Sequence, residues 1–273
     1  MTRPQSGISP AVSDRNIVLG FFGKTFSIAS MEMRKLRHDP TELFTRAIQP
    51  VLWLLLFGQV FSRRGIIPTG GRPYIDFLAP GILAQSVLFI AIFNGISIIW
   101  ERDQGIVYKF LASPTPRSAL VMGKALSSGA RALSQAIIIY LLGLSLGVSL
   151  SWDPASLLGV SLLILLGAAL FSTFSLIIAC LVKTRERFMG VGQVLTMPLF
   201  FASNAIYPTS LMPTWLQKIS HLNPLTYQVD GLRALMLKGG ISDFGLGLDF
   251  IVLAASLTLL VAISAWLYPN IAR

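Results

Sequence analysis

The residues of this chain that could support chemistry are few, and the clearest match among them is misleading. Gly23-Lys24-Thr25 fits the end of a phosphate-binding loop, G-x-x-x-x-G-K-[ST]. The first glycine of that loop would have to stand where Val18 is, and no strand pattern precedes the match. No acidic residue follows an apolar strand in a position to hold magnesium. The sequence therefore predicts that this chain does not hydrolyse ATP itself.

The candidate nucleophiles and metal ligands are isolated from one another. Cys180 is the single cysteine, and His38 and His221 lie far apart with no matching cluster. A membrane-embedded enzyme would need a nucleophile with a base, a carboxylate pair or metal-ligand spacing. None of these patterns occurs. We therefore expect no catalytic residue, no metal site and no cofactor bound by this chain.

Charged residues are scarce and leave long uncharged runs between them. Of the 273 residues, 53% are hydrophobic and 12% are charged, whereas a soluble domain carries about 25% charged residues. Crossing a bilayer takes about 20 helical residues, and the runs are continuously apolar, which favours helices over a barrel. We therefore expect an all-α membrane protein with six transmembrane helices in one domain, 1–273. The six runs are 47–62 (too short unless it starts near Phe44), 77–100, 132–152, 154–182, 188–217 and 250–272.

The net charge of +10 comes from basic residues at the ends of these runs, which argues against nucleic-acid binding. With a cytosolic N-terminus, the cytosolic segments hold 14 Lys and Arg and the outer loops hold 6. This bias predicts that both termini are cytosolic. The central parts of the runs lack charged residues, which disfavours an ion-coupled secondary transporter. The acidic residues at their ends are expected to be solvated caps: Asp76, Glu101, Asp153 and Asp249.

Two segments on the cytosolic side have helical patterns. Residues 17–37 carry an apolar stripe beside basic residues, which predicts an amphipathic helix lying in the membrane interface or packed on protein. Residues 101–116 begin with Glu101-Arg102-Asp103 and end with two prolines. Between them, Ile106, Val107, Phe110 and Leu111 form a short apolar face. We expect a docking surface for a cytosolic partner, with a helix resting on lipid as the alternative.

A third segment, 209–240, is too polar to span and too apolar for a free loop. Lys218, Asp230 and Arg233 prevent a full crossing, and prolines interrupt it. Leu211, Trp215 and similar residues make it apolar. Short helices that re-enter the outer leaflet would explain both features. Irregular backbone at that depth needs protein or water around it, so we expect this segment to face a pathway or a subunit interface.

These last two segments resemble the permease subunits of type-2 ABC exporters, and the daunorubicin/doxorubicin-resistance permease family among them. The first, from Glu101-Arg102-Asp103-Gln104-Gly105 to Ser113-Pro114, is similar to the family's coupling helix. Tyr108-Lys109 departs from the acidic residue that many relatives have there. The second is similar to the family's re-entrant segment and signature, and comprises Leu211-Met212-Pro213-Thr214-Trp215-Leu216, Asn223-Pro224-Leu225-Thr226-Tyr227 and Asp230-Gly231-Leu232-Arg233.

The resemblance implies a transport subunit in a bacterial or archaeal plasma membrane. Two permease copies would pair, as a homodimer or a heterodimer, and each would dock a separate ATPase that binds ATP and magnesium. The cargo would be a lipophilic drug or a lipid-linked substrate, with lipid-linked polysaccharide of the O-antigen or teichoic acid type as the alternative.

The candidate site residues fall into three groups. The expected ATPase-docking residues are Glu101, Arg102, Asp103, Gly105, Ile106 and Phe110. The expected signature residues are Pro208, Trp215, Asn223, Pro224, Tyr227 and Arg233, of which Asn223 and Tyr227 are expected to hold the re-entrant turn. Cargo would pass between subunits along the second and fifth spans, where path-lining or ordinary helix packing is expected of Met197, Phe200, Phe201 and Asn204.

Overall fold

The structure is a computed structural model that describes residues 48–62, 67, 69, 71–105, 117–182 and 184–267. Over these residues the chain is helical, and the single sheet-like pairing is a bridge between Leu150 and Leu237. The expected all-α class is therefore confirmed for the described part. The predicted interface helix, 17–37, and residues 106–116 of the predicted coupling segment lie outside it.

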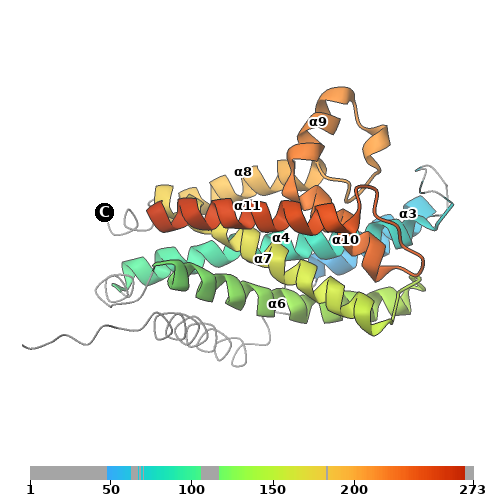
Figure 1. Ribbon diagram of the computed structural model, residues 1–273, viewed down its shortest axis with the longest axis horizontal. Coiled ribbons are helices and arrows are strands. Elements are labelled where there is room, and N and C mark those ends of the chain that lie inside the picture. Colours follow the sequence, from blue (N-terminus) through green and yellow to red (C-terminus); the bar gives the residue numbers. More distant parts are fainter. Residues whose placement is uncertain are drawn as a thin grey trace, which may run out of the picture.

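The long helices run side by side along the long axis of the molecule, and one short helix projects from their side (Figure 1). A first helix, Ile48–Phe61, is short and apolar and includes a π-helical stretch. The projecting helix is α9. In chain order the elements are η1 (Trp53–Gly58), α3 (Gln59–Ser62), α4 (Tyr74–Asp103), α6 (Arg117–Ser145), α7 (Pro154–Leu181), α8 (Arg185–Phe201), η2 (Thr209–Leu211), α9 (Thr214–Leu222), α10 (Pro224–Met236) and α11 (Leu246–Leu267).

Four of the described helices are long and apolar enough to cross a bilayer: Tyr74–Asp103, Met122–Ser145, Pro154–Leu181 and Leu246–Leu267. The first helix is shorter, and α8 has only 17 residues. Four of the six expected spans thus have helices of sufficient length, and the count of six stays a prediction. The uncharged run 188–217 is not continuous helix: α8 ends at Phe201, and η2 and α9 follow directly after Pro208 and Pro213.

The third uncharged run, 132–152, does not mark the bounds of its helix. The helix begins at Arg117 and ends at Ser145, so Lys124 and Arg131 lie within it. Each finds a polar partner on α4, which makes a basic residue tolerable there. Past its end, Gly147 adopts a φ of +77°, a left-handed conformation that suits glycine and turns the chain towards α7.

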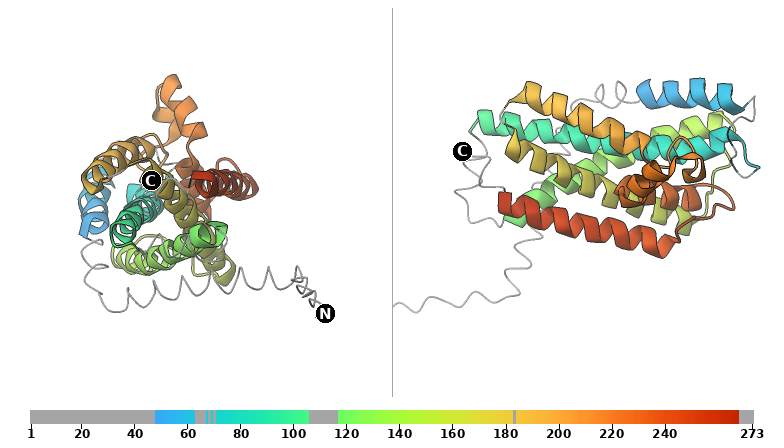
Figure 2. Two further views of the ribbon diagram at one scale, coloured as in Figure 1. Left: turned by 90° about the vertical axis from the view of Figure 1, so that its left-hand side faces the viewer. Right: turned by 90° about the horizontal axis from the view of Figure 1, so that it is seen from above.

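The core of the bundle is built around α7, which packs against α4, α6, α10 and α11. Its close contact with α4 depends on Gly95, because a Cβ there would lie 2.0 Å from the Ser175 hydroxyl oxygen of α7. That hydroxyl donates to the Ile92 carbonyl. Small residues of this kind allow membrane helices to approach closely. In the end-on view, α11 lies on the opposite side of the bundle from the first helix (Figure 2).

Candidate functional site

The end of the bundle where α4 finishes is held by a buried ion pair. The Lys124 ammonium on α6 lies 2.5 Å from Oε1 of Glu101 on α4, and these two side chains are 12% and 10% exposed. Glu101 was expected to be a solvated cap, and its burial corrects that expectation: α6 starts early enough to bring Lys124 against it. The pair ties together the two helices that flank residues 106–116. We call this end of the bundle the charged end.

A more exposed set of charges surrounds that pair. Asp103 lies 3.1 Å from Arg102 and 3.1 Å from Arg185, the first residue of α8. The Arg185 guanidinium also lies over the Trp100 ring, 3.7 Å from its centroid. Gly105, with a φ of +72°, turns the chain out of α4. The predicted docking residues Ile106 and Phe110 lie outside the described residues, and docking stays a prediction.

A row of polar side chains continues from this pair into the bundle between α4 and α6. Arg131 donates to Oδ1 of Asn94 over 3.1 Å, and the Asn94 amide donates to the Ser128 hydroxyl over 2.6 Å. Asn94 and Ser128 are both buried. Sequence reasoning missed this row, although four polar residues of α6 recur at helical spacing and so share one face. We call it the polar stripe: Lys124, Ser128, Arg131 and Gln135 of α6 with Glu101 and Asn94 of α4.

The predicted signature residues lie at the opposite end, where they fix the turn between α9 and α10. Asn223 caps α10, because its Oδ1 accepts from the Leu225 amide at 3.0 Å, and its side-chain amide donates to the Leu199 carbonyl at 2.6 Å. Pro224 occupies the first turn of α10, where its missing N–H is not needed. The Tyr227 hydroxyl donates to the His221 carbonyl at 2.8 Å.

Arg233 joins α10 to two other parts of the chain. Its guanidinium donates to the Asn204 carbonyl at 2.8 Å and lies over the Phe77 ring of α4, 3.8 Å from the centroid. Such a contact between a cation and an aromatic ring is attractive, more so where water is excluded. Asn204 is itself buried. The segment 209–240 is thus fastened to the far end of α4.

The candidate path residues divide between the core and the surface. Phe200 is fully buried and meets the Trp53 ring edge to face, with the centroids 5.8 Å apart. Phe201 is exposed, and Met197 is half-buried. Burial of Phe200 within one copy of the chain suits the ordinary helix packing that was expected for it ahead of path-lining, whereas Phe201 is exposed and can face lipid, cargo or a second copy.

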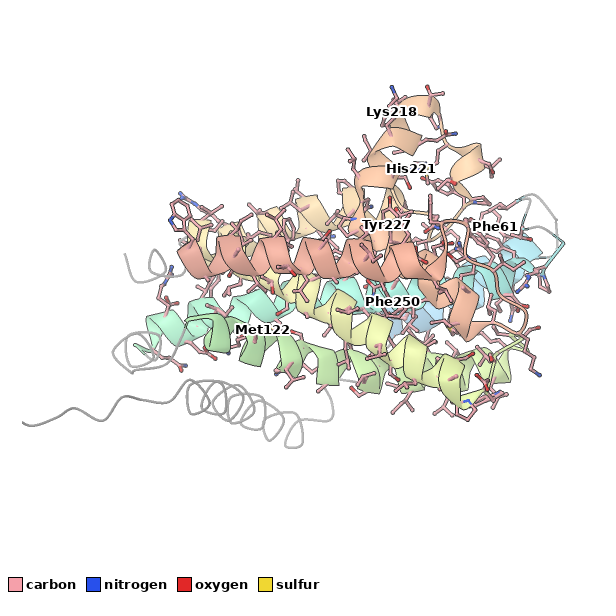
Figure 3. The ribbon with its side chains drawn as sticks, in the orientation of Figure 1. Phe61, Met122, Lys218, His221, Tyr227 and Phe250 are labelled. Atoms are coloured by element: carbon pink, nitrogen blue, oxygen red, sulfur yellow. The ribbon has the colours of Figure 1, made fainter. Side chains whose placement is uncertain are left out.

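The short helix α9 projects away from the bundle with its apolar side chains uncovered. Figure 3 shows Lys218 at its tip, His221 closer to the bundle, and Tyr227 at its base. Trp215 is 62% exposed and Leu222 is 84% exposed. Pro208 precedes the short helix η2 that leads into this region. Uncovered apolar surface of this kind is typical of contact with lipid or with another protein.

A pair of carboxylates ties α10 to α11. The Ser242 hydroxyl lies 2.8 Å from Oδ2 of Asp230 and 3.0 Å from Oδ2 of Asp249. Both aspartates are fully buried, so Asp249 is not the solvated cap that was expected. Asp76 is buried as well, and its Oδ1 accepts from the Ser149 amide. In the adjoining loop, burial and then the negative charge of Asp230 raise the pKa of Asp243.

Asp153 does behave as a cap. Its carboxylate accepts from the Ser156 amide at 3.0 Å, at the start of α7. Within the described ranges, no group of three or more His, Cys, Asp or Glu side chains lies close enough to hold a metal ion.

Comparison with known proteins identifies relatives of this chain. The sequence profile of the ABC-2 type transporter family matches residues 24–237. A Cyanophora paradoxa chain named as a transport permease, ycf38, is 31% identical over 217 residues, which cover 79% of this chain and 74% of that protein. The inner membrane transport permease YadH of Escherichia coli K12 is 29% identical over 207 residues, covering 76% and 78% of the two chains. The daunorubicin resistance ABC transporter permease protein DrrB1 of Streptomyces coeruleorubidus is 25% identical over 238 residues, covering 87% and 83%.

Proposed function

This chain belongs to the ABC-2 type transporter family, and on that premise we propose that it is the permease subunit of an ATP-driven exporter. The exporter would move a lipophilic drug or a lipid-linked substrate out of the cytoplasm or the inner leaflet of a bacterial or archaeal plasma membrane. A separate ATPase subunit would supply the energy. A second permease copy, most simply an identical one, would complete the pathway.

The observation that carries this proposal is the extent of the family match. Residues 24–237 include both the segment that resembles a coupling helix and the segment that resembles a re-entrant signature. One relative matched over most of both chains is named a daunorubicin resistance ABC transporter permease. That name supports a lipophilic drug as cargo, and a lipid-linked polysaccharide remains the alternative.

The geometry of α4 supports a route by which a partner could drive the permease. Its 30 residues form one helix from Tyr74 to Asp103, which at 1.5 Å per residue is about 45 Å long. The Glu101–Lys124 pair secures its charged end against α6, and the Arg233 contact secures Phe77 at its far end. A displacement of the charged end would therefore move the anchorage of the re-entrant segment.

The same geometry supports the proposed orientation. The helix α11 ends at Leu267 on the side of the bundle where α4 ends (Figure 1). If the charged end meets a cytosolic ATPase, the chain beyond α11 starts from the cytosolic side, in line with the excess of basic residues there.

The proposal is tested by transport in inside-out membrane vesicles that contain the full chain and a stand-alone ABC ATPase from the same genome. We expect the tagged chain to co-purify with that ATPase and the vesicles to accumulate daunorubicin when ATP is added. A partner variant without its phosphate-loop lysine is the control and should abolish accumulation. Accumulation that follows a proton gradient without ATP, or ATP hydrolysis by the purified chain alone, would contradict the proposal.

A further inference from the structure

A cavity of about 340 Å³ lies between the first helix, α4 and α6. Its lining includes Gln49 of the first helix, Gln85, Phe89 and Phe93 of α4, and Gln135 of α6. Gln85 follows the first residue of α4 by 11 positions, which at 1.5 Å per residue is roughly 16 Å. In a hydrocarbon layer about 30 Å thick, that distance sets the amides near mid-depth, where polar groups are costly.

Two of these amides have unmet hydrogen-bonding capacity. Gln85 is 3% exposed and Gln135 is 1% exposed, and in the described structure neither the nitrogen nor the oxygen of either side chain has a partner. Each buried group left unsatisfied costs about 1–3 kcal/mol. The two amides together offer both donors and acceptors, which a ligand rich in hydroxyl groups can satisfy, since each hydroxyl both donates and accepts.

The rest of the lining restricts the ligand further. None of the described residues around the cavity is ionisable, so a charged group there would be left without a counter-ion, which is strongly unfavourable. The nearest charge of the polar stripe, Arg131, already donates to Asn94. The rings of Phe89 and Phe93, whose centroids lie 6.0 Å apart, supply apolar aromatic surface. Amides beside aromatic rings suit a sugar or polyol, which has polar hydroxyls around its edge and C–H bonds on its face.

We propose that this cavity binds the uncharged, hydroxyl-bearing head, a sugar or a polyol, of an amphiphilic molecule. The inference rests on the proposed function in one respect, because it specifies the lipid-linked class of cargo proposed for that permease as one with an uncharged, hydroxyl-bearing head. The binding itself requires neither ATP nor a partner subunit.

The stability of the amide variants separates a binding role from a structural one. A glutamine that holds the fold together makes hydrogen bonds, and replacing it lowers the melting temperature. Gln85 and Gln135 make none in the described structure. Their replacement by leucine, which removes an unsatisfied amide, should therefore leave the melting temperature unchanged or raise it while binding weakens.

The test uses the full chain in lipid nanodiscs and radiolabelled n-octyl β-D-glucopyranoside below its micelle concentration. We expect saturable binding that n-octyl phosphate and n-octyl trimethylammonium do not displace. Gln85→Leu and Gln135→Leu should each weaken binding by about tenfold, the effect of losing roughly 1.4 kcal/mol of hydrogen bonding. Gln193→Leu is the matched control: Gln193 is exposed on α8, and its replacement should leave the affinity unchanged.

Nanodiscs that contain monoglucosyl diacylglycerol identify the source of the head group. Competition by this lipid would assign the site to two-chain glycolipids, and its absence to single-chain amphiphiles; either result supports the site. The proposal would be overturned by the absence of saturable binding, by equal displacement with the charged probes, or by wild-type affinity in both amide variants. Each of these results would mean that the cavity holds only water. Saturable glucoside binding by a chain that neither co-purifies with an ATPase nor transports when ATP is added would defeat the proposed function alone, and ATP-driven transport without glucoside binding would defeat this inference alone.

Discussion

Removing the lysine from the buried ion pair at the charged end should destabilise the protein strongly. In Lys124→Met the Glu101 carboxylate, whose side chain is only 10% exposed, loses the Lys124 ammonium that lies 2.5 Å from its Oε1. Breaking one partner of a buried pair costs about 3–5 kcal/mol, because the remaining charge is left in a medium of low polarity. We expect a loss of that size in the free energy of unfolding, measured by denaturant titration in detergent micelles.

A second ion pair in the same region supplies the contrast. Asp103 and Arg185 have side chains that are 40% and 36% exposed, so Asp103→Asn should cost under about 1 kcal/mol. The double variant Glu101→Leu with Lys124→Met should recover most of the single variant's loss, because an apolar pair of similar size can replace a buried ion pair. If Lys124→Met costs no more than Asp103→Asn, the reasoning from burial is refuted.

The same pair allows a docking role for Glu101 to be distinguished from a positioning role. Exchanging the charges, Glu101→Lys with Lys124→Glu, preserves the ion pair and reverses the charge at each position. If Glu101 positions the segment between α4 and α6, the exchanged variant should retain the ATPase partner and transport, whereas Lys124→Met should lose both. If Glu101 contacts the ATPase directly, the exchange should abolish co-purification although the protein remains folded.

Three further predictions, one of them with a control substitution, concern other parts of the chain. Gly81→Ala would bring a Cβ to 2.2 Å from the Ala205 carbonyl oxygen and should cost about 1–3 kcal/mol in the free energy of unfolding; Gly190→Ala, which meets nothing within 4 Å, should be neutral or stabilising. Asn223→Ala removes the cap of α10 and a second hydrogen bond, so thermal unfolding should show a loss of about 2 kcal/mol in the free energy of unfolding. A change no larger than that of Gly190→Ala would refute this prediction. The raised pKa of Asp243 means that its ionised form is disfavoured in the folded state, so wild-type stability should fall as pH rises through that pKa. Asp243→Asn should therefore raise the melting temperature at pH 8 and not below about pH 4, and an equal effect at both values would contradict the assignment.

Helices whose apolar sequence is continuous could be predicted from the sequence. The runs 77–100, 154–182 and 250–272 correspond to α4, α7 and α11, because apolar length alone decides whether a segment can span. The start of α6 could not be found in this way. The uncharged run starts directly after Arg131, so counting charges places the start of the helix too late. Only the packing of α6 against α4 shows that Arg131 and Lys124 have partners inside the bundle.

The roles of the acidic residues depended on tertiary contacts that no local pattern contains. Asp153 stands before a proline at the start of an apolar run and caps α7 as expected. Asp249 stands in a similar position before the last run but is buried against Ser242, because the loop after α10 folds back over it. A carboxylate near the end of a span is thus a cap or a buried ligand according to what packs on it.

The buried polar groups between α4 and α6 bear on function because two of them, the amides of Gln85 and Gln135, are costly to bury and make no hydrogen bond in the described structure. A fold needs a helix contact there, and apolar side chains would provide it without the cost of desolvating Arg131, Asn94 and two unpaired amides. The polar stripe runs from the Glu101–Lys124 pair to Gln135, and Gln135 lines the cavity near mid-depth. A row of polar groups that begins at the charged end, where the proposed ATPase would dock, and ends at a cavity is therefore best explained by transport. Replacing Gln85 and Gln135 with leucine should make the protein more stable and less active at once, a combination that a purely structural role would not produce.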